Sequence, residues 1–206
     1  MTKVKNVIMV MTKVKNVIIG RFPLLLDPMT DERIEDIWYG RKETRSKDLT
    51  PKQVAESKLI RVDGKLVVPT QYLYSCLVEA GRDVELKPRK KISTIESTLL
   101  YSLMDIEGEF LPLTNGVDDQ EPTWKTDKRL TRNKDKQGLP AFRPRFDHWS
   151  LAMVLNYDQV QVKDEKMREL FAAAGKIGIG PFRPQCRGPF GQFVVQSWEV
   201  RENGNS

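Results

Sequence analysis

The last third of the chain shows the clearest alternation of apolar and polar positions. Between Trp149 and Tyr157, large apolar residues occupy every second position, which predicts a strand with one buried face. The next segment has apolar residues three and four positions apart, so it predicts a helix capped by Asp164 and ended by Gly175. A further apolar segment at 190–200 predicts another strand. This region is therefore expected to form a β-α-β unit.

A second unit is predicted in the first half of the chain. Alternation over 14–26 indicates a strand, and an Asp-Gly pair in 60–68 is typical of a hairpin with a type I′ turn. A helix then follows Thr70, with Cys76 as a small core residue on its apolar stripe. Two such units sharing one sheet predict an α+β fold, a ferredoxin-like core with an antiparallel sheet.

Two other segments complete the expected organisation. A helix is expected after Thr30, with Ile34, Ile37 and Trp38 together on one face. Residues 114–146 have much charge and little periodic hydrophobicity, which indicates a long basic insertion loop that is functional or disordered.

The N-terminal sequence contains a direct repeat, because residues 1–8 recur as 11–18. Two copies do not make a solenoid, and both begin with Met. We therefore expect residues 1–13 to be a duplicated segment, arising from a duplicated start or an expression artefact. Residues 14–206 are expected to form a single domain with the insertion inside it.

Composition excludes several classes of protein. The chain has 206 residues, one histidine and two cysteines, so a disulfide scaffold or a site with two histidines is excluded. No apolar run approaches the roughly 18 residues of a membrane span, and there is no secretory signal. A reducing, cytoplasmic location is expected, without a cofactor and without membrane association.

Charge is concentrated in blocks, and the formal net charge is +6. Residues 105–121 include six acidic and no basic side chains, whereas 125–145 include eight basic and two acidic ones. Shorter basic runs occupy 41–52 and 87–91. Solvated loops are one interpretation of such blocks. Several basic segments together favour binding to a nucleic acid, because a polyanion neutralises them with release of counterions.

A glycine-rich segment, 175–191, joins the last predicted helix to the last strand. It contains five glycines, three prolines, three cations and two phenylalanines, and no acidic residue. Glycine lets a backbone approach a ligand closely and direct its N–H groups at an anion. Its order, helix before loop and strand after it, is not that of a nucleotide-binding loop. Plain turn chemistry is the alternative interpretation.

These residues resemble the RAMP superfamily, the repeat-associated proteins of CRISPR effector complexes, and especially their crRNA-binding backbone subunits. The similarity rests on the strand ending in 22–26, the step at 67–70 into a helix, and the glycines of the C-terminal loop. The resemblance implies an RRM-like core, guide RNA bound across a basic face, copies assembled head to tail, and other effector subunits as partners. A phage or plasmid relative would have the same features.

The candidate nucleic-acid-binding residues are the cations of the basic block and the polar and glycine residues of the loop. Trp124 and Phe182 are expected to stack on bases. The full set is Lys125, Lys128, Arg129, Arg132, Arg143, Arg145, Lys176, Gly178, Gly180, Phe182, Arg183, Arg187 and Gly188.

No catalytic residue and no metal site are predicted, so the chain is expected not to be an enzyme. Asp27 after the first strand, and Asp147 beside His148, are the candidates for a metal-dependent nuclease that the sequence leaves open. Two further alternatives are a phage-type single-stranded DNA coating protein and a structural assembly protein without nucleic acid. In the latter, acidic and basic blocks would pair between subunits.

Overall fold

The computed structural model describes residues 11–29, 31–40, 49–132 and 138–201. Its largest element is an antiparallel sheet in the order β12-β1-β11-β8-β4-β3, and β7 also pairs with β11. The strands of this sheet are β1 (Met11–Gly20), β3 (Arg61–Val62), β4 (Lys65–Pro69), β7 (Met104–Ile106), β8 (Phe110–Thr114), β11 (Ser150–Asp158) and β12 (Phe193–Arg201).

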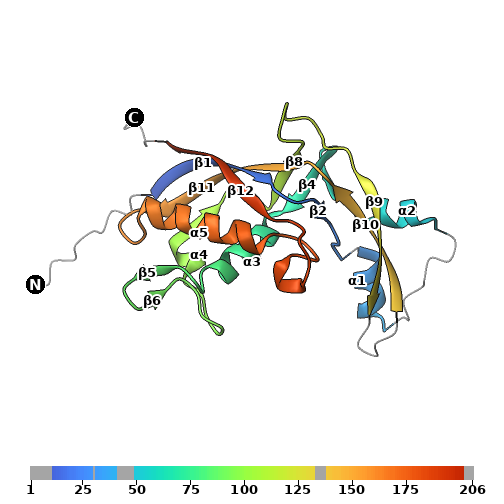
Figure 1. The fold of residues 1–206 in the computed structure, drawn as a ribbon, viewed down its shortest axis with the longest axis horizontal. Coiled ribbons are helices and arrows are strands. Elements are labelled where there is room, and N and C mark those ends of the chain that lie inside the picture. Colours follow the sequence, from blue (N-terminus) through green and yellow to red (C-terminus); the bar gives the residue numbers. More distant parts are fainter. Residues whose placement is uncertain (1–10, 30, 41–48, 133–137, 202–206) are drawn as a thin grey trace, which may run out of the picture.

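The predicted ferredoxin-like arrangement is confirmed in the order of these strands. The helix α3 (Thr70–Ala80) lies between β1 and β7 in the chain, and α5 (Asp164–Ile177) lies between β11 and β12. In the sheet, β1 separates β12 from β11, so the two β-α-β units interleave. Figure 1 shows α3 and α5 on the same side of the sheet. The fold is therefore α+β, with an antiparallel sheet covered on one face by two helices.

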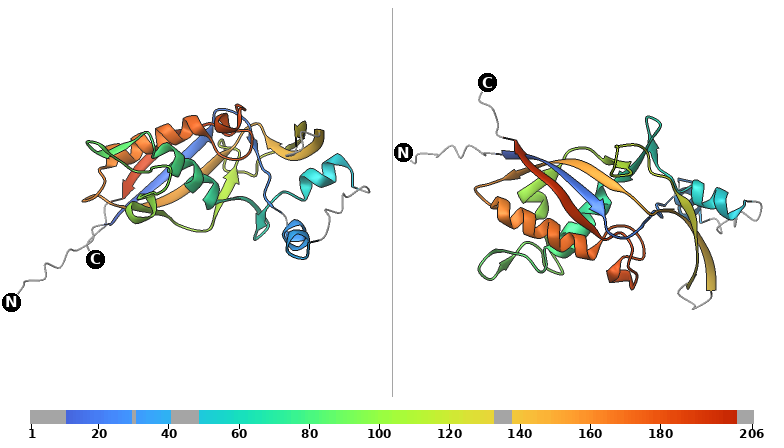
Figure 2. Two further views of the ribbon diagram at one scale, coloured as in Figure 1. Left: turned by 90° about the horizontal axis from the view of Figure 1, so that it is seen from below. Right: turned by 45° about the horizontal axis from the view of Figure 1, so that its top comes forward.

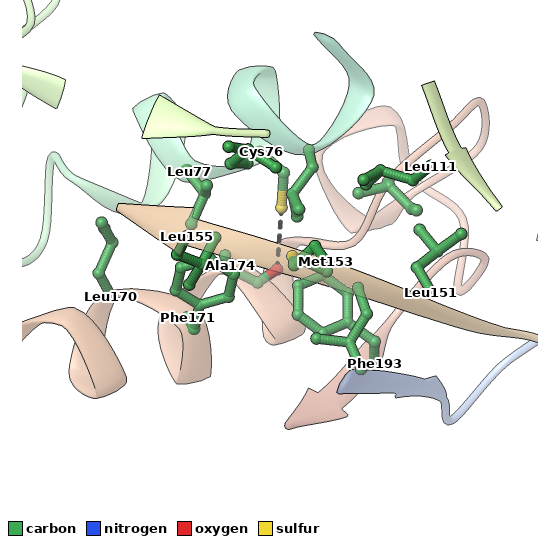
Figure 3. Close-up of a cluster of buried hydrophobic side chains, with 14 of the residues drawn as sticks. Cys76, Leu77, Leu111, Leu151, Met153, Leu155, Leu170, Phe171, Ala174 and Phe193 are labelled. Carbon is green, nitrogen blue, oxygen red and sulfur yellow. Dashed lines mark hydrogen bonds between the residues drawn. The ribbon is translucent and has the colours of Figure 1, made fainter. Parts of the chain in front are cut away.

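The hydrophobic core lies between the sheet and these two helices. The alternation predicted for β11 places Leu151, Met153 and Leu155 on the buried face, as the sequence indicated. Figure 3 shows them facing side chains of α3 and α5. The predicted core role of Cys76 is confirmed, because its thiol is buried and donates to the Ala174 carbonyl oxygen at 3.0 Å.

Two details of the C-terminal unit differ from the sequence prediction. Gly175 does not end α5, which continues to Ile177. Gly175 is instead where the helix touches β12, since a Cβ there would lie 2.3 Å from the Phe193 carbonyl oxygen. Asp164 is not the N-cap. Its carboxylate accepts a hydrogen bond from Trp198 Nε1 at 2.8 Å, which joins the helix start to β12, and one from Arg168 Nε at 2.6 Å within the helix.

The first predicted helix forms as α1 (Asp31–Trp38), but its apolar side chains do not pack into the core. Ile34, Ile37 and Trp38 are all exposed. Thr30, the expected cap, lies outside the described residues. The helix prediction is therefore confirmed, and the structure shows that its apolar face lies outside the core.

The hairpin predicted around the Asp-Gly pair is confirmed as β3 and β4. Asp63 and Gly64 both have positive φ angles, 51° and 78°, which a type I′ turn requires. The helix α2 (Pro51–Glu56) precedes it and begins with a capping box between Thr50 and Gln53.

The described residues of the basic insertion include two long strands, although its composition suggested a loop. Residues of 114–146 form β9 (Lys125–Arg132) and β10 (Gly138–Phe146), an antiparallel hairpin that is completed by β2 (Leu24–Leu25). Figure 2 shows this hairpin extending away from the main sheet. The helix α2 packs against both of its strands.

The remaining elements are short. They are the strands β5 (Glu85–Lys87) and β6 (Lys90–Lys91), the helix α4 (Leu100–Leu103), and a 3-10 turn, η1 (Pro184–Cys186), in the glycine-rich loop. Within the described ranges, no helix is long and apolar enough to cross a membrane.

Candidate nucleic-acid interface

One face of the β9–β10 hairpin carries four of the eight basic residues of the basic block. Lys125, Asp127 and Arg129 occupy alternate positions of β9 and therefore share a face. Their cross-strand partners include Arg145 opposite Lys125 and Arg143 opposite Asp127. The strand periodicity thus collects three arginines on one side of the hairpin.

Each of these arginines is held by an aspartate through its Nε atom. Arg129 donates to Asp127 at 2.8 Å, Arg143 to Asp27 at 2.6 Å, and Arg145 to Asp147 at 2.7 Å. Within the described residues, no hydrogen bond engages the Nη atoms of these three side chains, which leaves the outer donors of each guanidinium group unused. The carboxylates therefore orient the guanidinium groups without consuming all their donors.

Two rings from the glycine-rich loop lie between these guanidinium groups. The Arg129 guanidinium carbon is 4.5 Å from the Phe190 ring centre and 5.7 Å from that of Phe182. Arg143 lies 5.0 Å from Phe182, and Arg145 lies 5.7 Å from Phe190. We name this alternating set of Arg145, Phe190, Arg129, Phe182 and Arg143 the Arg-Phe ladder. Each contact is a cation–π interaction worth about 0.5–2 kcal/mol.

The electrostatics around the ladder favour the charged forms of its anchors. Burial acts to raise the pKa of the Asp147 carboxyl, but hydrogen bonds from Lys125 and Arg145 outweigh it and bring that pKa below its usual value. Asp147 also forms an ion pair of 2.5 Å with Lys125. Lys125, Arg145 and Asp147 therefore form a mixed cluster with one excess positive charge at the edge of the hairpin.

The backbone of the glycine-rich loop does not form the amide cradle that its composition suggested. Most of its N–H groups donate to backbone carbonyls, including those of Gly178, Ile179, Cys186, Arg187, Gly188, Phe190 and Gly191. The glycines allow close packing instead. A Cβ at Gly191 would lie 1.8 Å from the Ile179 oxygen, and one at Gly188 would lie 2.1 Å from the Phe182 oxygen. Turn and packing chemistry thus explains the glycines, while Lys176 and 184–187 remain exposed.

The structure brings together some of the predicted binding residues and separates others. Arg129, Arg143, Arg145 and Phe182 meet in the ladder. Arg143 is only 8% exposed, so in this structure its guanidinium group is largely a packing element. Lys128 is exposed on the opposite face of β9 from Arg129.

The remaining predicted residues lie along the loop or outside it. Arg183 donates to the Gly180 oxygen at 3.1 Å and to Gln185 at 3.0 Å, and Arg187 is exposed. Gly180 approaches the chain at Leu25, where a Cβ would lie 2.6 Å from the carbonyl oxygen. The side chain of Arg132 lies outside the described residues. Trp124 is half-buried and packs against the core, so it is not the exposed ring that stacking would need.

Asp27 is already neutralised by two cations. Besides Arg143, it forms an ion pair of 2.7 Å with Lys58. Tyr72 lies beside it, and burial, followed by the Asp27 charge, raises the pKa of the Tyr72 hydroxyl. Within the described ranges, no three His, Cys, Asp or Glu side chains are arranged to hold a metal ion. The arrangement makes Asp27 an anchor that joins β2, α2 and β10.

The acidic stretch 105–121 is largely paired within the molecule. Glu107 forms an ion pair of 2.6 Å with Lys13, and Asn156 Nδ2 donates to Asp105 at 3.0 Å. Arg61 donates two hydrogen bonds to the Glu121 carboxylate, at 2.6 and 2.8 Å. These hydrogen bonds are the main reason that the pKa of the Glu121 carboxyl is lowered. These contacts fix the stretch against β1, β3 and β11.

Sequence reasoning did not assign the aspartate anchors. A signal for one of them exists, because Asp127 and Arg129 are two residues apart on β9 and therefore share a face. Asp147 is likewise two residues from Arg145, but it lies just after the end of β10. No local signal identifies Asp27 with Arg143, which are separated by more than a hundred residues.

Comparisons with known proteins add little to this geometry. No family model and no curated protein matches the chain. One similar solved structure is a chain from the type III-B Cmr-beta complex bound to cognate target RNA, with 12% identity and a TM-score of 0.49. The match covers 93% of this chain and 61% of that chain, so this chain spans less than two thirds of its length. The resemblance to CRISPR repeat-associated proteins stays a prediction.

Proposed function

We propose that the protein is a non-catalytic subunit that binds single-stranded RNA through its phosphate backbone, with the β9–β10 hairpin and the glycine-rich loop as one surface. In this proposal the protein resembles the guide-RNA-binding subunits of CRISPR effector complexes. Several copies of it, together with other subunits, would bind along one RNA molecule. Phage-type coating of single-stranded DNA is the alternative use of the same surface.

The observation that carries the proposal is the position of Arg129 between Phe182 and Phe190. Through this contact, cations of the hairpin become continuous with exposed cations of the loop, although the two segments are far apart in sequence. Exposed cations with guanidinium groups held at fixed positions are suited to successive phosphates, since Arg donors match phosphate oxygens in pairs.

The face of the main sheet that is not covered by helices is a poorer candidate for RNA binding, because of its residue composition. On β1, β11 and β12 the face turned away from the helices carries residues such as Lys15, Val17, Ala152 and Ser197, with no aromatic ring. Proteins that bind RNA on such a sheet use aromatic side chains there to stack on bases. The half-buried ring of Phe182 in the glycine-rich loop is therefore the better candidate for stacking on a base.

A non-catalytic role fits the state of the candidate acids. Asp27 is bonded to Lys58 and Arg143, and Asp147 to Lys125 and Arg145. The two ion pairs of Asp147 lower the pKa of its carboxyl, which makes Asp147 a poor general base. Both acids are used to position cations.

The proposal is tested by fluorescence anisotropy with a labelled 20-nucleotide RNA and the matching DNA, over a series of KCl concentrations. The variant Lys125→Gln/Lys176→Gln/Arg187→Gln removes three exposed cations of the hairpin and the loop from the proposed surface. We expect weaker binding and a salt slope reduced by roughly 2, since each phosphate contact contributes about 0.7 for a single strand.

The matched control is Lys15→Gln/Lys65→Gln/Lys163→Gln, which removes the same charge from exposed positions elsewhere. We expect it to change the salt slope little. Equal losses in the two variants would overturn the assignment of the surface, and absence of binding in the wild-type chain would overturn the function. Tighter binding to DNA than to RNA would favour the coating protein, because 2′-hydroxyl contacts favour RNA.

A further inference from the structure

The direct repeat at the start of the chain coincides with a central strand of the main sheet. Its second copy, residues 11–18, forms most of β1, which lies between β12 and β11. Four side chains of this copy are buried on the face of the strand that packs into the core: Thr12, Val14, Asn16 and Ile18. The first copy, residues 1–8, has the same residue at every position. It therefore carries a complete duplicate of the pattern that β1 buries.

The spacing of the two copies preserves the buried face. They are offset by ten residues, and an even offset along a strand leaves the same side chains facing the core. Asn6 would then take the place of Asn16, whose buried amide nitrogen lies 4.0 Å from the Met153 sulfur. Within the repeat, nothing distinguishes the two copies as occupants of the position between β12 and β11.

The copies differ in the two residues that follow them. Ile19 and Gly20 follow the second copy, whereas Met9 and Val10 follow the first. Gly20 lies against Trp149, because a Cβ there would be 2.1 Å from Trp149 Nε1. The Trp149 ring is fully buried and its N–H donates to a backbone carbonyl oxygen at 2.9 Å, so it cannot move aside without disrupting the core. Val10 in the place of Gly20 would overlap this ring.

The connection after β1 favours the same copy. Three residues join β1 to β2, and they hold the glycine-rich loop through two backbone hydrogen bonds. Arg21 N donates to the Gln192 oxygen at 2.8 Å, and Gly191 N donates to the Pro23 oxygen at 2.9 Å. With the first copy in β1, the connection would lengthen by ten residues and Arg21 would no longer follow the strand directly. Because a longer loop costs little entropy, the overlap with the Trp149 ring is the larger difference.

We infer that Gly20 determines which copy of the repeat forms β1. The chain holds two interchangeable versions of this strand, and only the second is followed by a residue that fits beside the Trp149 ring. In the variant Val10→Gly/Gly20→Val, residues 1–8 would form β1 and residues 11–18 would be released. Because the connection after β1 also holds the glycine-rich loop, the same choice sets the position of that loop. The inference concerns the folding of this chain and does not depend on nucleic-acid binding.

The test is chemical cross-linking between neighbouring strands, from Ala152, which pairs with Val17 on the uncovered face of the sheet. Two reporter chains are compared, and both carry Cys186→Ala because that thiol is exposed. Val17→Cys/Ala152→Cys reports the second copy in β1, and Val7→Cys/Ala152→Cys reports the first. A short bismaleimide links the cysteines, the monomeric fraction is isolated, and the cross-linked tryptic peptides are quantified by mass spectrometry.

Substitutions at positions 10 and 20 are then added to both reporters. Without them, we expect cross-linking from position 17 and less than about a hundredth as much from position 7. Val10→Gly/Gly20→Val should reverse this ratio. Val10→Gly alone keeps Gly20, and therefore the observed fold, and it should raise cross-linking from position 7 at least about tenfold. Val10→Ala is the matched control and should change nothing, because any Cβ there would meet Trp149.

Three results would overturn the inference, whatever the RNA-binding result. One is equal cross-linking from positions 7 and 17 before any change at position 10. Another is an equal effect of Val10→Gly and Val10→Ala. The third is a double variant that unfolds, measured by circular dichroism, together with unchanged cross-linking in Val10→Gly.

Discussion

The guanidinium carbon of Arg129 lies 4.5 Å from the centre of the Phe190 ring, a contact between the basic hairpin and the glycine-rich loop. Phe190 is buried, and Arg129 is held in place by the buried carboxylate of Asp127. Arg129 thus contacts both the buried Phe190 ring and the buried Asp127 carboxylate, while part of its side chain reaches the protein surface.

The first prediction concerns this contact. Arg129→Lys keeps the charge but loses the planar group and its Nε donor, so it should lower the free energy of unfolding by about 1–2 kcal/mol. Lys128→Met, at the next position on the opposite face, should change it by less than about 0.5 kcal/mol. Urea denaturation measures both. Equal effects would show that the stack with Phe190 contributes nothing to stability.

A second prediction concerns Asp27, which joins Lys58 and Arg143. Asp27→Asn should lower the free energy of unfolding by about 3 kcal/mol, because it leaves the guanidinium group of Arg143 buried without its counter-charge. Adding Arg143→Met should recover at least about 1 kcal/mol in a double-mutant cycle. A nuclease role would appear instead as divalent-ion-dependent cleavage of RNA by the wild-type chain, lost in Asp27→Asn with stability unchanged.

The third prediction concerns packing in the glycine-rich loop. Gly191→Ala should destabilise by about 3 kcal/mol or more, because its Cβ would lie 1.8 Å from the Ile179 oxygen at a φ of +70°. Gly64→Ala provides the matched control, since Gly64 has a φ of +78° but no atom within 4 Å of the new Cβ. Backbone strain alone should then cost about 1–2 kcal/mol. Similar losses would contradict the packing role of Gly191.

The fourth prediction concerns the dependence of stability on pH. Burial raises the pKa of the Cys76 thiol from 9.0 to about 12. The folded chain therefore retains this proton at a pH where the unfolded chain loses it. The resulting stability is fully present below about pH 9 and is lost as the pH rises towards 12, by at most about 1.4 kcal/mol per pH unit.

Comparing pH slopes isolates this effect from packing losses. Cys76→Ala should flatten the decline in the free energy of unfolding between pH 9 and 10.5, whatever its effect at pH 7. Cys186→Ala should leave the slope unchanged, because that thiol is exposed in the folded chain. A slope that is identical in the wild-type and Cys76→Ala chains would contradict the assignment.

The elements that were predicted correctly are those in which apolar positions recur with the period of the strand or helix that contains them. The strand around Met153 and the helix containing Leu170 show this, since both bury one face against the same core. The hairpin around Asp63 and Gly64 was predicted because its turn requires positive φ angles. Such signals are local, so a single sequence is enough to read them.

The β9–β10 hairpin has no such signal. Its inner face packs guanidinium groups against rings and carboxylates, so its strands have no period of apolar residues. The apolar stripe of α1 predicted the helix correctly, but periodicity does not predict what the apolar face of a helix contacts.

Periodicity, turn residues and the clustering of charge were sufficient for the α+β core and for the choice of the hairpin and loop as the candidate surface. Only the tertiary structure showed that Arg129 stacks on Phe190 and that Arg143 donates to Asp27. It also showed that most N–H groups of the glycine-rich loop donate to backbone carbonyl oxygens. The physical reason is that charge–ring contacts and close backbone packing depend on the distances between segments remote in sequence, which no local pattern of residues specifies.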